Sequence, residues 1–138
     1  MNRYMICMKC AKCCFNTEMI LTPSDIRRIS RLGYDPKEFT VKRNGFVTLR
    51  NVDGACYFLN RKTLRCSIYP HRPIGCKLYP IVYDMATNTL TIDRECPMYW
   101  TVTRIDLIEA RPIMARALWE LRILRPNELP KLPKELGV

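Results

Sequence analysis

Four cysteines lie close together near the start of the chain, in the run ICMKCAKCC: Cys7, Cys10, Cys13 and Cys14. A two-residue gap between cysteines lets a tight turn aim both sulfurs at one centre, as in many structural metal sites. Apolar packing does not require four thiols in eight positions, although a single cysteine often serves as a small buried residue. We therefore interpret these four side chains as metal ligands.

The later cysteines, Cys56, Cys66, Cys76 and Cys96, do not form the second C-x₂₋₄-C pair that is common in structural zinc sites. A C-x₂-C-x₂-C triple with a remote Cys-Pro, here Cys96–Pro97, is instead typical of bacterial ferredoxins. The pattern favours an iron–sulfur cluster of the [4Fe–4S] type, with zinc as the alternative or as a second metal. The predicted cluster ligands are Cys7, Cys10, Cys13 and Cys96. The predicted metal ligands as a whole are Cys7, Cys10, Cys13, Cys14, Cys56, Cys66, Cys76 and Cys96.

The adjacent pair Cys13–Cys14 raises the question of how many centres there are. In an extended segment successive side chains point to opposite sides, so the two thiols could serve two centres, or one metal and one free thiol. Eight thiols match two four-coordinate centres, and they equally match one cluster with spare thiols. Cys56 alone could also be a small buried hydrophobic residue.

Few other side chains suggest chemistry. His71 is the only histidine and lies in a Pro-rich turn, where a surface or hydrogen-bonding role is favoured over metal binding. Arg72 could donate to turn carbonyls, or toward a thiolate or cluster sulfur. A cysteine beside a cation can be an activated nucleophile. With one histidine no Cys–His–carboxylate set is recognisable, so no catalytic residue is predicted.

The composition predicts a small globular protein. The chain has 138 residues, of which 48% are hydrophobic and 26% charged. No apolar run approaches the ~18 residues of a membrane span, and the first ten residues lack a secretory signal. We therefore expect a cytoplasmic protein with no membrane association. In the cytoplasm, cysteines are more often metal ligands than disulfide partners. Proteins of hyperthermophiles are an exception, and they are also depleted in thermolabile residues such as glutamine, which this chain lacks.

The formal charge of +10 is compatible with nucleic acid or an acidic protein partner. Two centres of four thiolates, each with a net charge of about −2, would lower the total to about +6. A redox or protein partner is expected, and nucleic acid is possible through arginines on two predicted helices, although ordinary solvated helix faces are favoured for them. These arginines are Arg27, Arg28 and Arg31, and Arg111, Arg116, Arg122 and Arg125.

The elements that must position the cysteines are short, and they predict a small α+β fold stabilised by metal. Thr22, Pro23 and Asp25 predict a helix start with a capping box, and Gly33 occupies the C′ position. Its buried stripe is expected to be Ile26, Ile29 and Leu32. The segment Asp35–Glu38 should open a second short turn of helix.

Three hairpins are expected after these helices. Asn44–Gly45 predicts a type I′ turn, a second turn should lie at Asn60–Lys62, and a third hairpin covers residues 81–93. In the second hairpin, strand pairing should bring Cys56 and Cys66 together.

The C-terminal part has a helical pattern over residues 103–124, which Pro112 should break or kink, giving helices over about 104–110 and 113–124. Residues 126–138 form a Pro-rich extended tail that could wrap the domain or stay mobile. We expect a cysteine-cluster metal-binding domain over 1–100, a helical segment over 101–125 that packs on it, and the tail over 126–138.

Several motifs together resemble the CxxCxxCC cysteine-cluster family. They are the N-terminal cluster, LTPSDIRRIS, CYFL with RCSIYPHRPIGCKLYP, and the late Cys96, and they cover residues 7 to 97. The resemblance implies a zinc- or iron-chelating domain. Lys12 stands where a glycine is common in the family. The cysteine domain of flagellin lysine methylase, a [4Fe–4S] protein, is distantly similar, but no Gly-rich loop for S-adenosylmethionine follows a strand here, so that activity is not expected.

Overall fold

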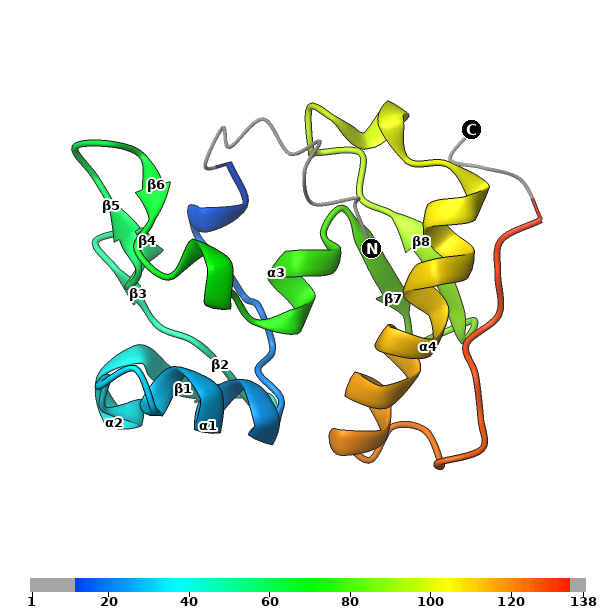
Figure 1. The fold of residues 1–138 in the computed structure, drawn as a ribbon, viewed down its shortest axis with the longest axis horizontal. Coiled ribbons are helices and arrows are strands. Elements are labelled where there is room, and N and C mark those ends of the chain that lie inside the picture. Colours follow the sequence, from blue (N-terminus) through cyan, green and yellow to red (C-terminus); the bar gives the residue numbers. More distant parts are fainter. Residues whose placement is uncertain (1–11, 135–138) are drawn as a thin grey trace. The chain divides into compact units, whose positions relative to one another are not determined.

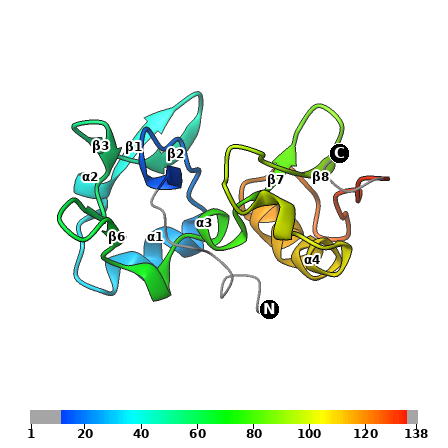
Figure 2. The same ribbon diagram turned by 90° about the horizontal axis from the view of Figure 1, so that it is seen from above.

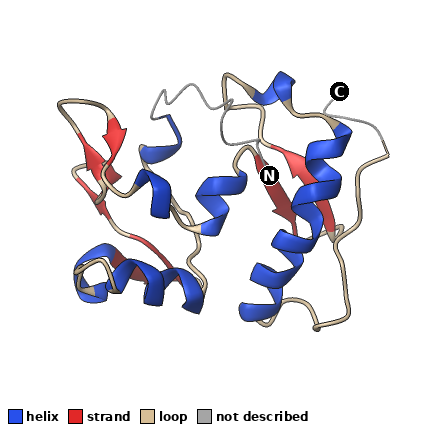
Figure 3. Ribbon diagram, viewed as in Figure 1, coloured by secondary structure: helices blue, strands red, loops and turns tan. Residues whose placement is uncertain are grey.

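The structure is a computed structural model that describes residues 12–134 (Figure 1). The described chain divides into two compact units, residues 12–76 and residues 77–134, which we treat separately. Helices and short antiparallel strand pairs occur in both, which confirms the α+β fold class (Figure 3). No helix in residues 12–134 is both long and apolar enough to cross a membrane.

The first unit contains the following elements: η2 (Lys12–Cys14), α1 (Pro23–Ser30), α2 (Pro36–Phe39), β1 (Thr40–Arg43), β2 (Phe46–Leu49), β3 (Asn51–Val52), β4 (Ala55–Cys56), β5 (Leu59–Asn60), β6 (Arg65–Cys66) and η3 (Tyr69–His71). The short helix α3 (Ile74–Leu78) spans the boundary between the two units. The second unit contains β7 (Ile81–Asp84), β8 (Thr89–Ile92), η4 (Tyr99–Thr101) and α4 (Arg104–Glu120). The strands pair in sequence order into four two-stranded antiparallel sheets. The predicted domain limits at residues 100 and 125 stay a prediction.

Helix α1 begins as predicted. The Thr22 side chain accepts a hydrogen bond from the Asp25 N–H at 3.1 Å, and Asp25 accepts one from the Thr22 N–H at 3.0 Å. The C-cap is Arg31, so C′ is Leu32, and Gly33, with φ of +105°, lies one position beyond C′ instead of at C′ as predicted. Leu32 is 42% exposed, which makes its predicted burial wrong, because the helix ends at Ser30 and Leu32 no longer follows the helical period.

Two of the predicted hairpins are confirmed. Asn44 and Gly45 both have positive φ between β1 and β2, as a type I′ turn requires, and β7 pairs with β8. The second prediction was partly wrong, because Cys56 pairs with Asn51 in the β3–β4 hairpin and only Cys66 lies on β5–β6. The reason is the turn at Asp53–Gly54, where both residues have positive φ, a turn signal that the sequence prediction did not use.

The core of the first unit connects α1 and α2 with the hairpins. Ile29, Phe39 and Phe58 are almost fully buried in it. Tyr34 packs edge-to-face on Phe58, with ring centroids 5.0 Å apart. Because the strands of β3 to β6 have only two residues each, this packing, more than ladder hydrogen bonds, holds them in place.

In the second unit, α4 packs against β7 (Figures 1 and 2). The helix runs through Pro112 without interruption, so the predicted division into two helices was wrong. Pro112 lies on the exposed side of the helix, whereas Leu107 and Met114 remain buried on the other side, so the proline does not interrupt the packed face.

The Pro-rich tail packs against the second unit. Lys131 pairs with the edge of β8, where its carbonyl accepts the Leu90 N–H at 2.8 Å and its N–H donates to the Asn88 carbonyl at 2.7 Å. Arg111 of α4 donates to the Pro130 carbonyl at 2.6 Å. Arg104 of α4 donates to the Pro133 carbonyl at 2.8 Å, so the tail is bound along β8 and α4 as far as Pro133.

Candidate metal centre

The first unit carries five of the eight cysteines: Cys13 and Cys14 on η2, Cys56 on β4, Cys66 on β6 and Cys76 on α3. Burial is the largest cause of the raised pKa of Cys56, Cys66 and Cys76, and the hydrogen bond to Cys13 is the largest cause at Cys14. The negative charge of Cys13 adds to the rise at all four, so these sulfurs lie within range of its field. Residues far apart in sequence, on four short elements, are thus gathered in one region.

The remaining three cysteines are not part of this described group. Cys7 and Cys10 lie outside the described residues, and Cys96 belongs to the second unit. No disulfide joins any two of the described cysteines. Within residues 12–134 no three Cys, His, Asp or Glu side chains stand close enough to hold one ion. Of the C-x₂-C-x₂-C triple, only Cys13 is described, so the predicted ligand set stays a prediction.

Cys13 and Cys14 interact directly instead of pointing apart. They lie in the 3₁₀ turn η2, not in the extended backbone assumed from the sequence, and their thiols hydrogen-bond to each other. This hydrogen bond is the main cause that lowers the pKa of Cys13 to about 7, with burial opposing it and the charge of Arg72 assisting. The same bond, together with burial, raises the pKa of Cys14. Cys13 is thus favoured as a thiolate and Cys14 as a thiol.

The deeper thiols favour the neutral form when no cation is present. Burial raises the pKa of Cys56 to about 11, and it raises the pKa of Cys66 and Cys76 as well. A bound metal would reverse this, because a coordinating thiol is deprotonated by the charge of the ion. Cys56 also packs in the hydrophobic core, so both of its predicted roles remain compatible with its position.

Arg72 performs one of its two predicted roles, donation to a turn carbonyl, and donation toward a thiolate or cluster sulfur stays a prediction. Its Nε donates to the Tyr69 carbonyl at 2.8 Å, and its guanidinium lies 3.7 Å from the centre of the Tyr69 ring. Its charge helps to lower the pKa of Cys13, and it partly offsets the rise that burial causes in the pKa of Cys66 and Cys76. Held by Tyr69, Arg72 is a fixed positive charge beside the cysteines. His71 is exposed at the end of η3, consistent with the predicted surface role.

Asp25 positions this region, a role that the sequence analysis missed. Besides capping α1, its Oδ1 accepts the Ile74 N–H at 3.0 Å and the Arg28 Nη2 at 2.9 Å. Arg28 also donates to the Arg72 carbonyl at 2.8 Å. The start of α1 therefore holds the chain on both sides of Pro73, next to Arg72 and Cys76. The spacing of Asp25 and Arg28 predicts their ion pair, but nothing local indicates Ile74, 49 residues away.

Comparison with known families agrees with this chemistry. A family model described as "Putative zinc- or iron-chelating domain" matches residues 6–97, which contain all eight cysteines. The chain belongs to the CxxCxxCC family. The CxxCxxCC domain also has a relative in Methanocaldococcus jannaschii, the uncharacterized protein MJ0661, 34% identical over 92 residues. That match covers 62% of the chain and 50% of the relative, so the chain spans half the length of this relative. No solved structure matches the chain.

The residues present fit a thiophilic metal. The donor set of the CxxCxxCC domain is all thiol, the thiols are not used up in disulfides with one another, and Arg72 provides a nearby positive charge. Thiolates select zinc and iron–sulfur clusters over hard cations such as magnesium and calcium. Family membership and donor chemistry therefore both support metal binding. Zinc and iron both accept four thiolates, so the donor set does not distinguish them.

Proposed function

We propose that this CxxCxxCC domain binds an iron–sulfur cluster of the [4Fe–4S] type through cysteine thiolates and acts in electron transfer, in redox sensing or in support of a partner enzyme. Cys7, Cys10 and Cys13 are the proposed ligands from the triple, and Cys96 is proposed as the fourth from its Cys-Pro context. When bound, such a cluster supplies one-electron redox chemistry. The cytoplasm is the proposed location, because thiols remain reduced there.

The observation that carries this proposal concerns Cys13, the described member of the triple: it forms no disulfide with another described cysteine, and it is favoured as a thiolate. Cys14, Cys56, Cys66 and Cys76 are then available for a second metal or as buried thiols. A C-x₂-C-x₂-C triple without a second C-x₂₋₄-C pair supports a cluster over a structural zinc site.

The protein's own contribution would be to set the reduction potential. Burial, hydrogen bonds to sulfur and nearby charge are the means by which a protein tunes a cluster. Arg72 beside the thiols and a formal charge of +10 stabilise the more negative, reduced state. We therefore expect a midpoint potential above that of acidic ferredoxins. A midpoint as low as theirs, measured by redox titration of the purified protein, would contradict this expectation.

The deciding experiment is anaerobic purification followed by an absorption spectrum and metal analysis. We expect a broad band near about 400 nm and about four irons per chain. Cys13→Ser should lose iron and colour, whereas Cys56→Ala, at a core position, should keep the cluster. Colourless wild-type protein with one or two zinc ions per chain would overturn the iron–sulfur proposal.

The alternative is a zinc-stabilised binding module for nucleic acid or a protein partner. It is favoured by exposed arginines in a chain of charge +10: Arg27 on α1, Arg31 at the C-cap of α1, and Arg122 and Arg125 after α4. Arg28 and Arg111 contribute less, since each already hydrogen-bonds within its own unit. Zinc would act by fixing the fold.

Salt dependence tests this alternative. Titration of a fluorescent single-stranded RNA should show affinity that falls steeply with salt, because released counterions drive binding to phosphates. Absence of binding at low salt would exclude nucleic acid as the partner.

A further inference from the structure

Helix α4 is apolar on two opposite faces. One face is buried in the second unit and includes Leu107, Met114 and Leu118. The other face is exposed: Ile105 is 66%, Ile108 52% and Trp119 40% exposed, and Pro112 is exposed between them. We call these four residues the apolar stripe.

The spacing of the apolar stripe places its members on one line. Positions 105, 108, 112 and 119 are separated by three, four and seven residues, which return to the same side of an α-helix. Large side chains exposed along one face indicate a contact surface more than isolated exposed residues do. The stripe is not needed to pack α4, because the opposite face already does so.

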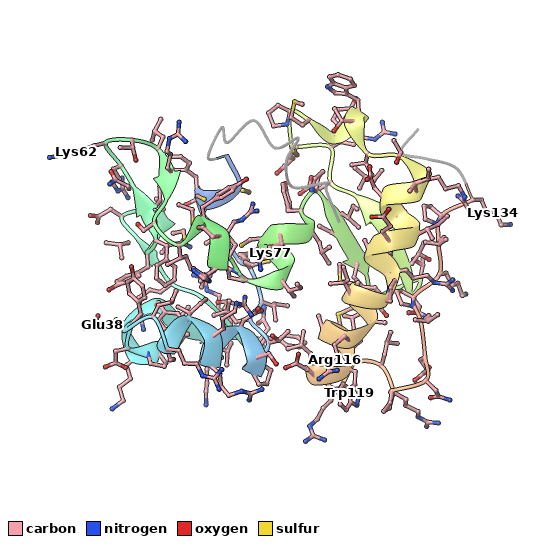
Figure 4. All side chains as sticks on the ribbon, in the orientation of Figure 1. Glu38, Lys62, Lys77, Arg116, Trp119 and Lys134 are labelled. Carbon is pink, nitrogen blue, oxygen red and sulfur yellow. The ribbon has the colours of Figure 1, made fainter. Side chains whose placement is uncertain are left out.

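Two opposite charges lie along one edge of the apolar stripe. Glu109 and Arg116 are both exposed and lie seven residues apart, so they share the same flank of α4. Arg116 is stacked on Trp119, with its guanidinium carbon 4.7 Å from the ring centre (Figure 4). Within residues 12–134 neither residue forms a salt bridge, so both charges are available to a partner surface.

From this arrangement we propose that the apolar stripe binds the same stripe of a second copy of the chain, with the two α4 helices antiparallel. Face-to-face antiparallel packing about a two-fold axis at Pro112 places residues equally distant from Pro112 at the same level. Glu109, three residues before Pro112, then lies beside Arg116 of the second copy, four residues after it. The two-fold axis generates this Glu109–Arg116 pair twice, and each pair joins a negative charge to a positive one.

The parallel arrangement lacks this complementarity. In a parallel pair, the two-fold axis runs along the helices and places the Glu109–Arg116 flanks of the two copies on opposite sides of the interface. Glu109 of one copy then does not meet Arg116 of the other. The charges thus select the antiparallel dimer, much as flanking charges set partner orientation in coiled coils.

The ends of the apolar stripe also match. In the antiparallel register Ile105 of one copy reaches the level of Trp119 of the other. Beside Trp119 the second unit has a hollow of about 540 Å³, lined by the apolar Ile123, Leu124 and Pro126 and by the charged Glu120, Arg122, Arg125 and Glu128. Ile105 would therefore meet the apolar part of a concave surface that has charged residues around it.

The contact area predicts a weak, concentration-dependent dimer. A helix of 17 residues is about 26 Å long, and one such helix pair is at the small end of specific interfaces. The positive net charge opposes association at long range, but at about 0.15 M salt the Debye length is ~8 Å and adjacent pairs still interact.

The test is sedimentation analysis of the full chain with its metal bound, from about 1 to about 500 µM at about 0.15 M salt. The mean mass of the wild type should rise from one chain toward two. Arg116→Glu, and separately Glu109→Arg, should each raise the dimer Kd about tenfold, because both symmetric pairs become repulsive. The double swap Glu109→Arg/Arg116→Glu should restore the wild-type Kd.

Lys62→Glu is the matched control, because it makes the same charge change on the exposed β5–β6 turn of the other unit (Figure 4). It should leave the dimer intact. Circular dichroism checks that each variant keeps its helix. Ile105→Lys, at an exposed position, gives a second variant that should abolish the dimer. A wild type that stays monomeric at the highest concentration overturns the proposal. A double swap that fails to restore association overturns the antiparallel pairing.

Discussion

At the scale of single residues, the thiols of the first unit differ because their immediate neighbours differ. Cys13 accepts a hydrogen bond from Cys14 and lies in the field of Arg72, whereas desolvation of the half-buried Cys76 raises its pKa well above the usual value. The ionised form is thus favoured at one sulfur and disfavoured at the others until a cation is present. In the metal-free protein the thiols should therefore differ in their reactivity toward alkylating reagents.

We predict that in metal-free, reduced protein Cys13 is alkylated by iodoacetamide much faster than Cys56. With a pKa of about 7, roughly half of Cys13 is thiolate at pH 7, against about one part in ten thousand for Cys56 with a pKa of about 11. Lowering the pH below about 7 should slow the Cys13 reaction about tenfold per unit. Peptide mass spectrometry measures both rates in one sample. Equal rates at the two sites would contradict the assigned environments.

A conservative substitution of Asp25 should destabilise the first unit, because this carboxylate joins the start of α1 to the segment around Pro73. Asp25→Asn removes the charge that pairs with Arg28 and leaves one fewer acceptor for the buried N–H groups of Thr22 and Ile74. We expect the free energy of unfolding to fall by about 2–3 kcal/mol, as for other buried charged hydrogen-bond networks. Urea denaturation of the metal-loaded protein measures it.

Asp35→Asn is the matched control for this substitution. Asp35 caps α2 through the Lys37 N–H at 2.9 Å but is exposed, and asparagine caps a helix about as well as aspartate. Its cost should be below about 0.5 kcal/mol. Similar losses in the two variants would show that Asp25 acts only as a helix cap.

At the scale of elements, α4 shows how packing can override a local signal. Pro112 lacks the N–H that would bond to the Ile108 carbonyl, and it occupies the middle of a 17-residue helix. The helix continues because its buried face packs as one surface and the proline lies on the exposed side. The same exposure places Pro112 at the centre of the apolar stripe.

Pro112→Ala should therefore stabilise the chain. Restoring the missing hydrogen bond and the helix propensity should add about 1–3 kcal/mol to the free energy of unfolding. Thermal unfolding at a concentration where the chain is monomeric measures the change. Pro126→Ala, in the exposed segment after α4, should leave stability unchanged or slightly lower. A lower melting temperature for Pro112→Ala would mean that the proline ring makes a stabilising contact.

At the scale of the whole molecule, the two units rest on different kinds of support. The second unit has a long helix packed on a hairpin of two four-residue strands and held by the C-terminal tail. The first unit places its cysteines on strands of two residues, on a single 3₁₀ turn and on the five-residue helix α3. Elements this short are not stable by themselves, so this unit should depend more on bound metal.

Removing the metal should consequently destabilise the first unit more than the second. After treatment with a chelator under reducing conditions, amide hydrogen exchange should accelerate about a hundredfold or more in residues 51–76, since structural metal binding contributes directly to folding. Exchange in α4 should change far less. Restoring the metal should restore protection, which controls for irreversible damage. Uniform acceleration along the chain would contradict the distinction between the units.

The sequence by itself determined the features that depend on neighbouring residues. The capping box at Thr22 and Asp25, the type I′ turn at Asn44–Gly45, and the family with its metal-chelating chemistry all follow from short motifs. Such motifs suffice because caps, tight turns and ligand pairs involve groups only a few positions apart, whose geometry the local backbone sets.

Only the tertiary structure decided features that join distant segments. It placed Cys56 on a different hairpin from Cys66, carried α4 through Pro112, and connected Asp25 to the Ile74 N–H 49 residues away. The hydrogen bond between Cys13 and Cys14, and the electrostatic interaction of both with Cys56, also required the folded chain. The physical reason is common to all of them: burial and long-range hydrogen bonds act between surfaces that exist only once the chain has folded.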